Sequence, residues 1–148
     1  MKTVLLCTAV LLLSICMCCA TTPTGPAASP SPQLTAPPFT EVRRQHATMT
    51  TAEWDVFRDT LIGARVDWEG WVSDVQALSD GYMVFVDLDP PHAATPLGND
   101  VNLTVTDRRA AALQKGDRIC FSGTVVDVWV PLTTLTVKLA DATFQPTP

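Results

Sequence analysis

Apolar and polar residues alternate through residues 64–78, which is the pattern of a β-strand with one buried face. The positions that share that face are Val66, Trp68, Gly70 and Val72. The alternation loses phase at Trp71 and Val75, close to Gly70. Because a phase break at a glycine inside a strand is typical of a bulge, we expect this strand to bend sharply there.

Further apolar stretches with period-two alternation predict four more strands. They cover residues 82–88, 101–106, 118–130 and 135–144. The turn sequence SDG at 79–81 joins the first two strands in a hairpin. Pro131 ends the fourth strand, because proline cannot occupy a central position of a β-ladder.

Two segments have helical patterns instead. Thr50 is followed three residues later by Glu53, which is a capping box, and Gly63 closes the segment. The apolar residues between them are Trp54, Phe57 and Leu61, at helical spacing. This predicts a helix over 51–61. A second, shorter helix is expected over 107–114, with Asp107 as its cap and three alanines favouring it.

The order of these elements predicts the fold class. Five strands with a short helix between strands 3 and 4 make the order of the oligonucleotide/oligosaccharide-binding (OB) fold. We therefore expect a mainly β protein, with a five-stranded OB-fold barrel and an N-terminal flanking helix.

A short phrase occurs twice in the predicted strands, as VDWEGWVSDV at 66–75 and as ICFSGTVVDV at 119–128. Each copy has a glycine at its fifth position, Gly70 and Gly123. In a small closed barrel some strands curl strongly, and they do so where a side chain is missing or a residue is bulged. We therefore expect both glycines to mark barrel bends.

The sequence around the second glycine carries a family resemblance. LQKGDRICFSGTVVDV at 113–128 and LTVKLADATF at 135–144 resemble the tRNA-anticodon-binding-like OB domains of exported bacterial proteins and lipoproteins. The resemblance covers about residues 60–145. It implies the OB fold, transfers no catalytic residue, and carries no expectation of tRNA binding for exported members.

Residues 1–20 have the build of an export signal, with Lys2, an apolar run and then small residues. One interpretation is a bacterial lipoprotein signal that is lipidated on a cysteine. The candidate cysteines are Cys16, Cys18 and Cys19. The alternatives are cleavage after Ala20 followed by secretion, and an uncleaved N-terminal anchor.

Residues 21–49 are expected to be a disordered tether, because their N-terminal part is rich in proline, threonine, serine and alanine. Such a spacer would hold a folded module, expected over 50–146, away from a membrane surface. The expected location is the bacterial cell membrane or outer membrane.

Charge and residue types limit the chemistry. A formal net charge of −5 is unfavourable for nucleic-acid binding, which depends on phosphate neutralisation. His46 and His92 lack metal-ligand spacing, and neither metal nor cofactor is expected. Cys120 is expected to be a small buried apolar residue. The pairs Asp87/Asp89 and Asp74/Asp80 flank turns, where aspartate commonly caps the backbone.

The ligand surface of OB barrels is formed by strands 2 and 3 and by neighbouring loops. Here the candidate residues are Tyr82, Val84, Asn102 and Trp129. Sequence alone does not decide between this alternation and the opposite one. These features indicate a non-enzymatic module that binds an envelope protein or a small ligand. The alternative is recognition of single-stranded nucleic acid or oligosaccharide.

Overall fold

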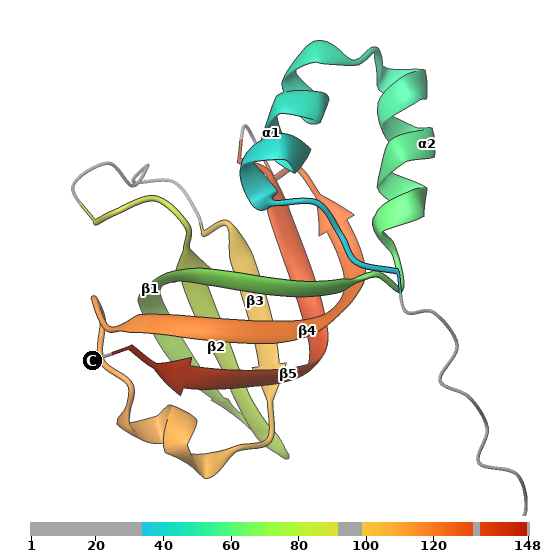
Figure 1. Ribbon diagram of the computed structural model, residues 1–148. Coiled ribbons are helices and arrows are strands. Elements are labelled where there is room, and N and C mark those ends of the chain that lie inside the picture. The colour runs from blue at the N-terminus through green and yellow to red at the C-terminus, as the bar shows by residue number, and fades with distance from the viewer. Residues whose placement is uncertain (1–33, 92–98, 132–133, 148) are drawn as a thin grey trace, which may run out of the picture. The chain divides into compact units, whose positions relative to one another are not determined.

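Five β-strands form a closed barrel in a computed structural model that describes residues 34–91, 99–131 and 134–147 (Figure 1). Neighbours around the barrel follow the order β1-β2-β3-β5-β4. The strands are β1 (Arg65–Leu78), β2 (Gly81–Asp87), β3 (Val101–Val105), β4 (Arg118–Trp129) and β5 (Thr136–Pro146). The predicted fold class, a mainly β protein with an OB-fold-like barrel, is confirmed.

The first strand is shared between two neighbours. Residues 65–71 of β1 pair with β4, and residues 71–78 pair with β2. The register with β2 shifts between Val72 and Asp74, so Ser73 is the bulged residue. Gly70 lies just before this change of partner. A Cβ at Gly70 would come within 2.5 Å of Val86 Cγ1 and 2.7 Å of the Asp87 carbonyl oxygen.

The first halves of the two copies of the repeated phrase lie opposite each other in the β1–β4 ladder. Val66 pairs with Gly123 and Gly70 pairs with Ile119, while Trp68 pairs with Phe121 at the centre. Equivalent positions of the two copies are therefore related by a local two-fold arrangement. The repeat encodes two strand segments that pair with each other.

Gly123 lies at a second irregularity. The register between β4 and β5 shifts between Ser122 and Thr124, and Asp141 on β5 has a φ of 50°. A Cβ at Gly123 would be 3.1 Å from Leu139 Cβ and 3.2 Å from the Ala140 carbonyl oxygen. This space is tight, but it is less closed than the space at Gly70.

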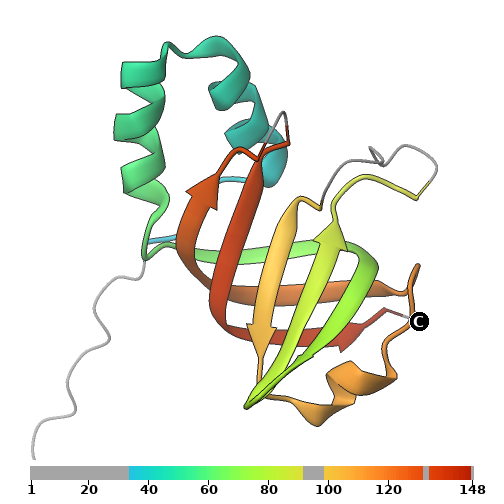
Figure 2. The same ribbon diagram turned by 180° about the vertical axis from the view of Figure 1, so that it is seen from behind.

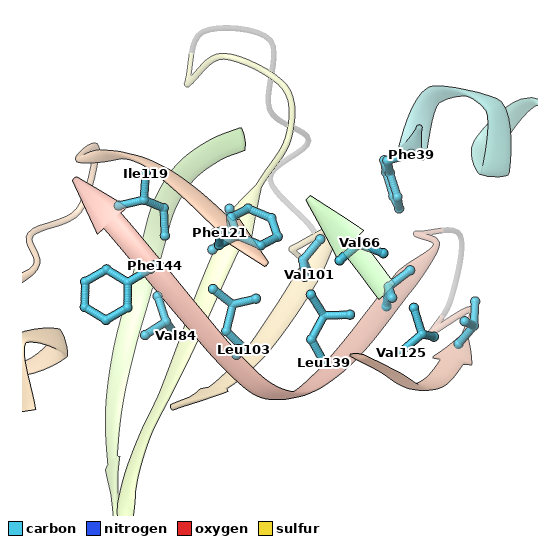
Figure 3. Close-up of a cluster of buried hydrophobic side chains, with 14 of the residues drawn as sticks. Phe39, Val66, Val84, Val101, Leu103, Ile119, Phe121, Val125, Leu139 and Phe144 are labelled. Carbon is cyan, nitrogen blue, oxygen red and sulfur yellow. The ribbon is translucent and has the colours of Figure 1, made fainter. Parts of the chain in front are cut away.

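Alternating side chains from all five strands fill the barrel (Figure 3). Fully buried members include Val66, Val84, Val101, Leu103, Ile119 and Leu139. Cys120 lies between Ile119 and Phe121, which both point inward, so its own side chain points outward and is exposed. The expectation that Cys120 is buried is therefore wrong.

The predicted helix at residues 51–61 is α2 (Thr51–Leu61). The Thr50 side chain accepts a hydrogen bond from the Glu53 backbone N–H, and the Glu53 side chain accepts one from the Thr50 backbone N–H. Trp54 and Leu61 are buried and Phe57 is partly buried against them. The capping box and the apolar spacing thus located this helix.

A second helix, α1 (Phe39–Thr48), lies within the segment expected to be a tether. Phe39 and Val42 are buried in the barrel core, and α1 lies over the upper end of the barrel (Figure 1). Just before it, the Leu34 carbonyl and the Ala36 N–H form hydrogen bonds with Arg65. The expected tether over 21–49 therefore needs correction, because its C-terminal part belongs to the folded domain.

The connection between β3 and β4 is a 3₁₀ helix, η1 (Arg108–Ala112), and not the longer helix expected over 107–114. The Asp107 side chain caps it by accepting a hydrogen bond from the Arg109 N–H. Ala110 is fully buried, so this short helix closes the lower end of the barrel (Figure 1).

Candidate binding face

OB barrels bind their ligands on the outer surface of strands 2 and 3 and on neighbouring loops, which here means β2 and β3 with the adjoining part of β1 beside them. Val84, Val86 and Leu103 point into the barrel and are fully buried. The alternate residues therefore point outward, and they are only partly buried. They are Met83 and Phe85 on β2, and Asn102 and Thr104 on β3. Figure 2 shows this face of β2 and β3 with no helix lying across it.

Two aromatic side chains from neighbouring strands lie on this face. Trp71 of β1 pairs with Asp87 of β2, and Phe85 lies two residues before Asp87 on the same strand. Cross-strand diagonal neighbours are about 7–8 Å apart, within reach of aromatic side chains. Met83 continues the same row on β2. We refer to Trp71, Met83 and Phe85 as the aromatic row.

Polar groups border the aromatic row on both sides. Phe85 pairs with Asp74 of β1 and with Asn102 of β3, and Met83 pairs with Thr104. The Asp74 carboxylate accepts hydrogen bonds from the Val75 N–H and from the Gln76 side chain. The face thus combines a partly exposed apolar centre with carboxylate, amide and hydroxyl groups.

One cation contacts the aromatic row. The Arg118 guanidinium lies 5.7 Å from the centre of the Trp71 ring. The same guanidinium forms an ion pair of 2.8 Å with Glu69. Because Glu69 offsets its charge, Arg118 does not make this face basic.

The four ligand candidates predicted from the sequence do not all lie on this outer face. Val84 is fully buried, so the expectation that it contacts a ligand is wrong: it belongs to the inward alternation of β2. Asn102 lies on the outer face. Tyr82 is partly buried and packs against the core at the start of β2. Trp129 is the last residue of β4 and is partly buried, away from the β2–β3 pair.

The aromatic row includes Trp71 and Met83, which were not among the candidate ligand residues. Met83 and Phe85 belong to the second of the two alternations possible for residues 82–88, and the sequence alone did not decide between them. For Trp71 the signal was the phase break near Gly70, which placed its side chain on the face opposite Val72.

The carboxylates of Asp87, Asp89 and Asp100 lie close to one end of this face, and their charges influence one another. Burial, followed by the nearby charge of Asp100, raises the pKa of Asp87, while Lys115 opposes this shift. Burial also raises the pKa of Asp100, against the hydrogen bond from the Leu88 N–H and the charge of Arg43. The Leu88 N–H to Asp100 Oδ2 distance is 2.8 Å.

Arg43 connects α1 to these carboxylates. Its guanidinium lies 2.9 Å from Asp89 and 3.2 Å from Asp100. The Phe39 ring packs edge-on against Trp68 with ring centres 5.6 Å apart. Ion pairs from Arg43 therefore attach α1 to both ends of the β2–β3 connection. The contact between Phe39 and Trp68 attaches the same helix to the barrel.

A second hollow, of about 390 Å³, lies over the outer surface of β1, β4 and β5. Its outward-facing lining residues are Asp67, Glu69, Cys120, Ser122, Thr143 and Gln145. Cys120 Sγ lies 3.9 Å from a Glu69 carboxylate oxygen and 3.7 Å from Thr147 Oγ1. These side chains line a shallow trough, and the Glu69 carboxylate beside the thiol is itself ion-paired with Arg118.

The remaining polar candidates occupy structural positions. His46 packs edge-on against Trp54, with ring centres 4.7 Å apart. His92 lies outside the described residues. Within the described ranges, no group of three or more histidine, cysteine, aspartate or glutamate side chains is arranged to hold a metal ion.

Comparison with protein-family models, with curated proteins and with solved structures found no significant match. None of the helices in the described part of the chain has the length and apolar character needed to cross a membrane. The leader, the lipidation candidates Cys16, Cys18 and Cys19, and the site after Ala20 lie outside the described residues.

Proposed function

We propose that this chain is a non-enzymatic binding module that is exported and held at the bacterial cell envelope by a lipidated cysteine. The leader supports export, and Cys16, Cys18 and Cys19 all follow its apolar run at distances suited to lipidation. The proline-rich residues that follow would give the folded domain reach from the membrane surface.

The observation that carries the binding function is the aromatic row on the outer face of β1 and β2. Tryptophan, phenylalanine and methionine are enriched where proteins contact partners, and charged groups normally lie at the rim of such contacts. Here Trp71, Met83 and Phe85 form the centre, while Asp74 and Asp87 lie beside them. We therefore assign this face to contact with an envelope protein or a small ligand.

The alternative function is recognition of single-stranded nucleic acid or oligosaccharide. Two aromatic side chains on an OB-type face favour it, because nucleobases stack on aromatic rings. The local charge opposes nucleic acid, because Arg118 is paired with Glu69 and Asp74 and Asp87 lie on the same face. Neutral saccharide is compatible with the amide and hydroxyl groups of Asn102 and Thr104.

Site-specific photo-crosslinking in the producing cell tests the proposed face. A benzophenone amino acid replaces Phe85 in the full chain, and a matched variant carries it at Val56, which is 69% exposed on α2. We expect one discrete adduct at position 85 that is absent at position 56 and is lost with Trp71→Ala. Equal adducts at both positions, or none at position 85, would contradict the assignment.

Titration with fluorescent oligonucleotides and glycans separates the two functions. The proposal predicts no saturable change in anisotropy with single-stranded DNA or RNA at low or high salt. Tight association that weakens steeply with salt would instead establish the nucleic-acid function. Saturable glycan binding that Trp71→Ala abolishes would establish the oligosaccharide function.

A further inference from the structure

Two aromatic rings and two carboxylates alternate on the outer face of the β1–β2 ladder. Trp71 is directly opposite Asp87, and Asp74 is directly opposite Phe85. Directly opposite residues of a ladder share one face, with Cβ atoms about 4.5–5.5 Å apart. Each ring therefore has a carboxylate across the ladder from it, and Phe85 has Asp87 two residues along its own strand as a second one. We name these four residues the aromatic–acidic quartet.

A complete group of ring, carboxylate and cation occurs beside the quartet. The Arg118 guanidinium lies 5.7 Å from the centre of the Trp71 ring and 2.8 Å from the Glu69 carboxylate. The ring attracts the cation through its quadrupole, and the carboxylate attracts it through its charge. The chain thus shows, with its own side chains, how a cation is held at this face.

The carboxylates around Phe85 have no such cation among the described residues. The Asp74 carboxylate accepts hydrogen bonds from the Val75 N–H and from the Gln76 side chain, and both of these donors are neutral. The Asp87 carboxylate forms neither a hydrogen bond nor an ion pair with a described residue. Phe85 therefore has the ring and the carboxylates of the arrangement at Trp71, but lacks the cation.

The surrounding charges leave the quartet acidic. Arg43 and Arg118 are already ion-paired, with Asp100 and Glu69 among their partners. Burial, followed by the charge of Asp100, raises the pKa of Asp87, and the opposing charge of Lys115 does not cancel this shift. The face thus has carboxylate charge that the nearby cations do not neutralise.

We propose that the aromatic–acidic quartet binds a basic segment of a partner protein, with a lysine or arginine side chain against Phe85 and beside Asp74 and Asp87. These two carboxylates are diagonal neighbours across the ladder, where residues are about 7–8 Å apart, so one cation can contact both. The cation completes at Phe85 the arrangement that Arg118 completes at Trp71. This inference rests on the proposed binding function of the outer face.

The aromatic row favours a polypeptide as the source of this cation. Met83, Phe85 and Asp87 are successive outward positions of β2, so they extend over about 14 Å at 3.4 Å per residue. That length matches about four residues of an extended peptide, whose alternate side chains point to one side. A basic residue and an apolar residue two positions apart would contact Phe85 and Met83 together.

Titration with three matched peptides tests the partner chemistry. Each peptide has nine residues in a glycine and serine background, with a central leucine and with lysine, glutamine or glutamate two positions to either side of it. The full chain, labelled with ¹⁵N and held in a neutral detergent, is titrated with each peptide, and NMR shifts of its backbone amides report affinity and place.

We expect the lysine peptide to shift the amides of residues 71–74 and 85–87, and to bind about tenfold more tightly than the glutamine peptide. The glutamate peptide should bind more weakly than either. Asp74→Asn combined with Asp87→Asn should remove most of the preference for lysine. Asp67→Asn is the matched control, because Asp67 is an exposed carboxylate on the same strand without an ion pair to a described residue, and it should leave the preference unchanged.

Equal affinity for the lysine and glutamine peptides at this face would overturn the basic partner and leave the proposed binding face intact. A lysine preference that survives the double substitution, or that shifts amides elsewhere, would overturn the role of the quartet. Absence of binding by all three peptides would also overturn the inference. The crosslinked adduct at position 85 decides the proposed binding face separately in each case.

Discussion

Gly70 and Gly123 occupy equivalent positions in the two copies of the repeated phrase, but their surroundings differ. At Gly70 a Cβ would come within 2.5 Å of Val86 Cγ1 and 2.7 Å of a backbone oxygen of β2. At Gly123 the nearest atom would be 3.1 Å away. A side chain is therefore excluded more strictly at Gly70 in β1 than at Gly123 in β4.

This difference predicts the relative cost of two matched substitutions. Gly70→Ala should lower the free energy of unfolding by about 2–3 kcal/mol, because the backbone oxygen of Asp87 cannot move without disturbing the ladder. Gly123→Ala should cost about 1 kcal/mol, because a few tenths of an ångström relieve its contacts. Urea unfolding of both variants measures the two values. An equal cost at both glycines would contradict this account.

The raised pKa of Asp87 predicts a pH-dependent effect of removing its charge. In the folded state this carboxyl binds a proton more readily than in the unfolded chain, so its ionisation destabilises the fold above the raised pKa. Asp87→Asn should therefore increase stability at pH 7, by up to about 0.5 kcal/mol. The increase should fade as the pH falls below the ordinary value of 3.8. Thermal unfolding of Asp87→Asn and the unmodified chain between pH 7 and pH 3 measures this stability difference. A difference that grows as the pH falls would contradict the prediction.

At the scale of elements, α1 is attached to the barrel through few contacts. Arg43 reaches Asp89 and Asp100, whereas the neighbouring Arg44 pairs only with Glu41 among the described contacts and stays on its own helix. Asp100 is largely buried, so loss of Arg43 would leave a buried carboxylate that retains, among the described residues, the hydrogen bond from the Leu88 N–H. The two arginines thus provide a matched comparison.

Arg43→Ala should cost about 1–2 kcal/mol of unfolding free energy, because a buried charge loses its cation. Arg44→Ala should cost much less than this, as is usual for an exposed pair within one helix. Chemical denaturation with hydrogen exchange of α1 would measure both effects. A cost for Arg44→Ala that matches or exceeds that for Arg43→Ala would refute the role given to Arg43.

The apolar contacts of α1 predict that residues 39–48 are part of the cooperative fold. Phe39→Ala should lower the unfolding free energy by about 3 kcal/mol, because Phe39 is 4% exposed and belongs to the barrel core. Val56→Ala on α2 is the control, and it should change stability by less than about 0.5 kcal/mol. If Phe39→Ala unfolds at the same denaturant concentration as the unmodified chain, α1 is not an integral part of the domain.

At the scale of the whole molecule, alternation and turn residues were sufficient to predict the barrel. They were sufficient because the inward residues of the five strands are mostly apolar and alternate with outward ones between the bulges. Helix α1 was missed because its sequence, FTEVRRQHAT, has only two residues that become buried, and it follows a proline-rich stretch. Its helical state depends on contacts with Trp68, Asp89 and Asp100, which are distant in the sequence.

The binding face was predicted only in part. Strands 2 and 3 were expected to form it, and Asn102 lies on their outer surface. The choice between alternations could not be made locally, because residues 82–86 are almost continuously apolar. Only the pairing with β1 and β3, which buries Val84 and Val86, turns Phe85 and Met83 outward.

The mass of the mature N-terminus is the most direct test of the central claim, that this barrel is a tethered module of the cell envelope. The chain is expressed in full, recovered with membranes and analysed by mass spectrometry of its first proteolytic fragment. We predict that it begins at Cys16, Cys18 or Cys19 and carries a diacylglycerol thioether on that cysteine. A fragment that begins at Thr21 or at Met1 without lipid would contradict the account.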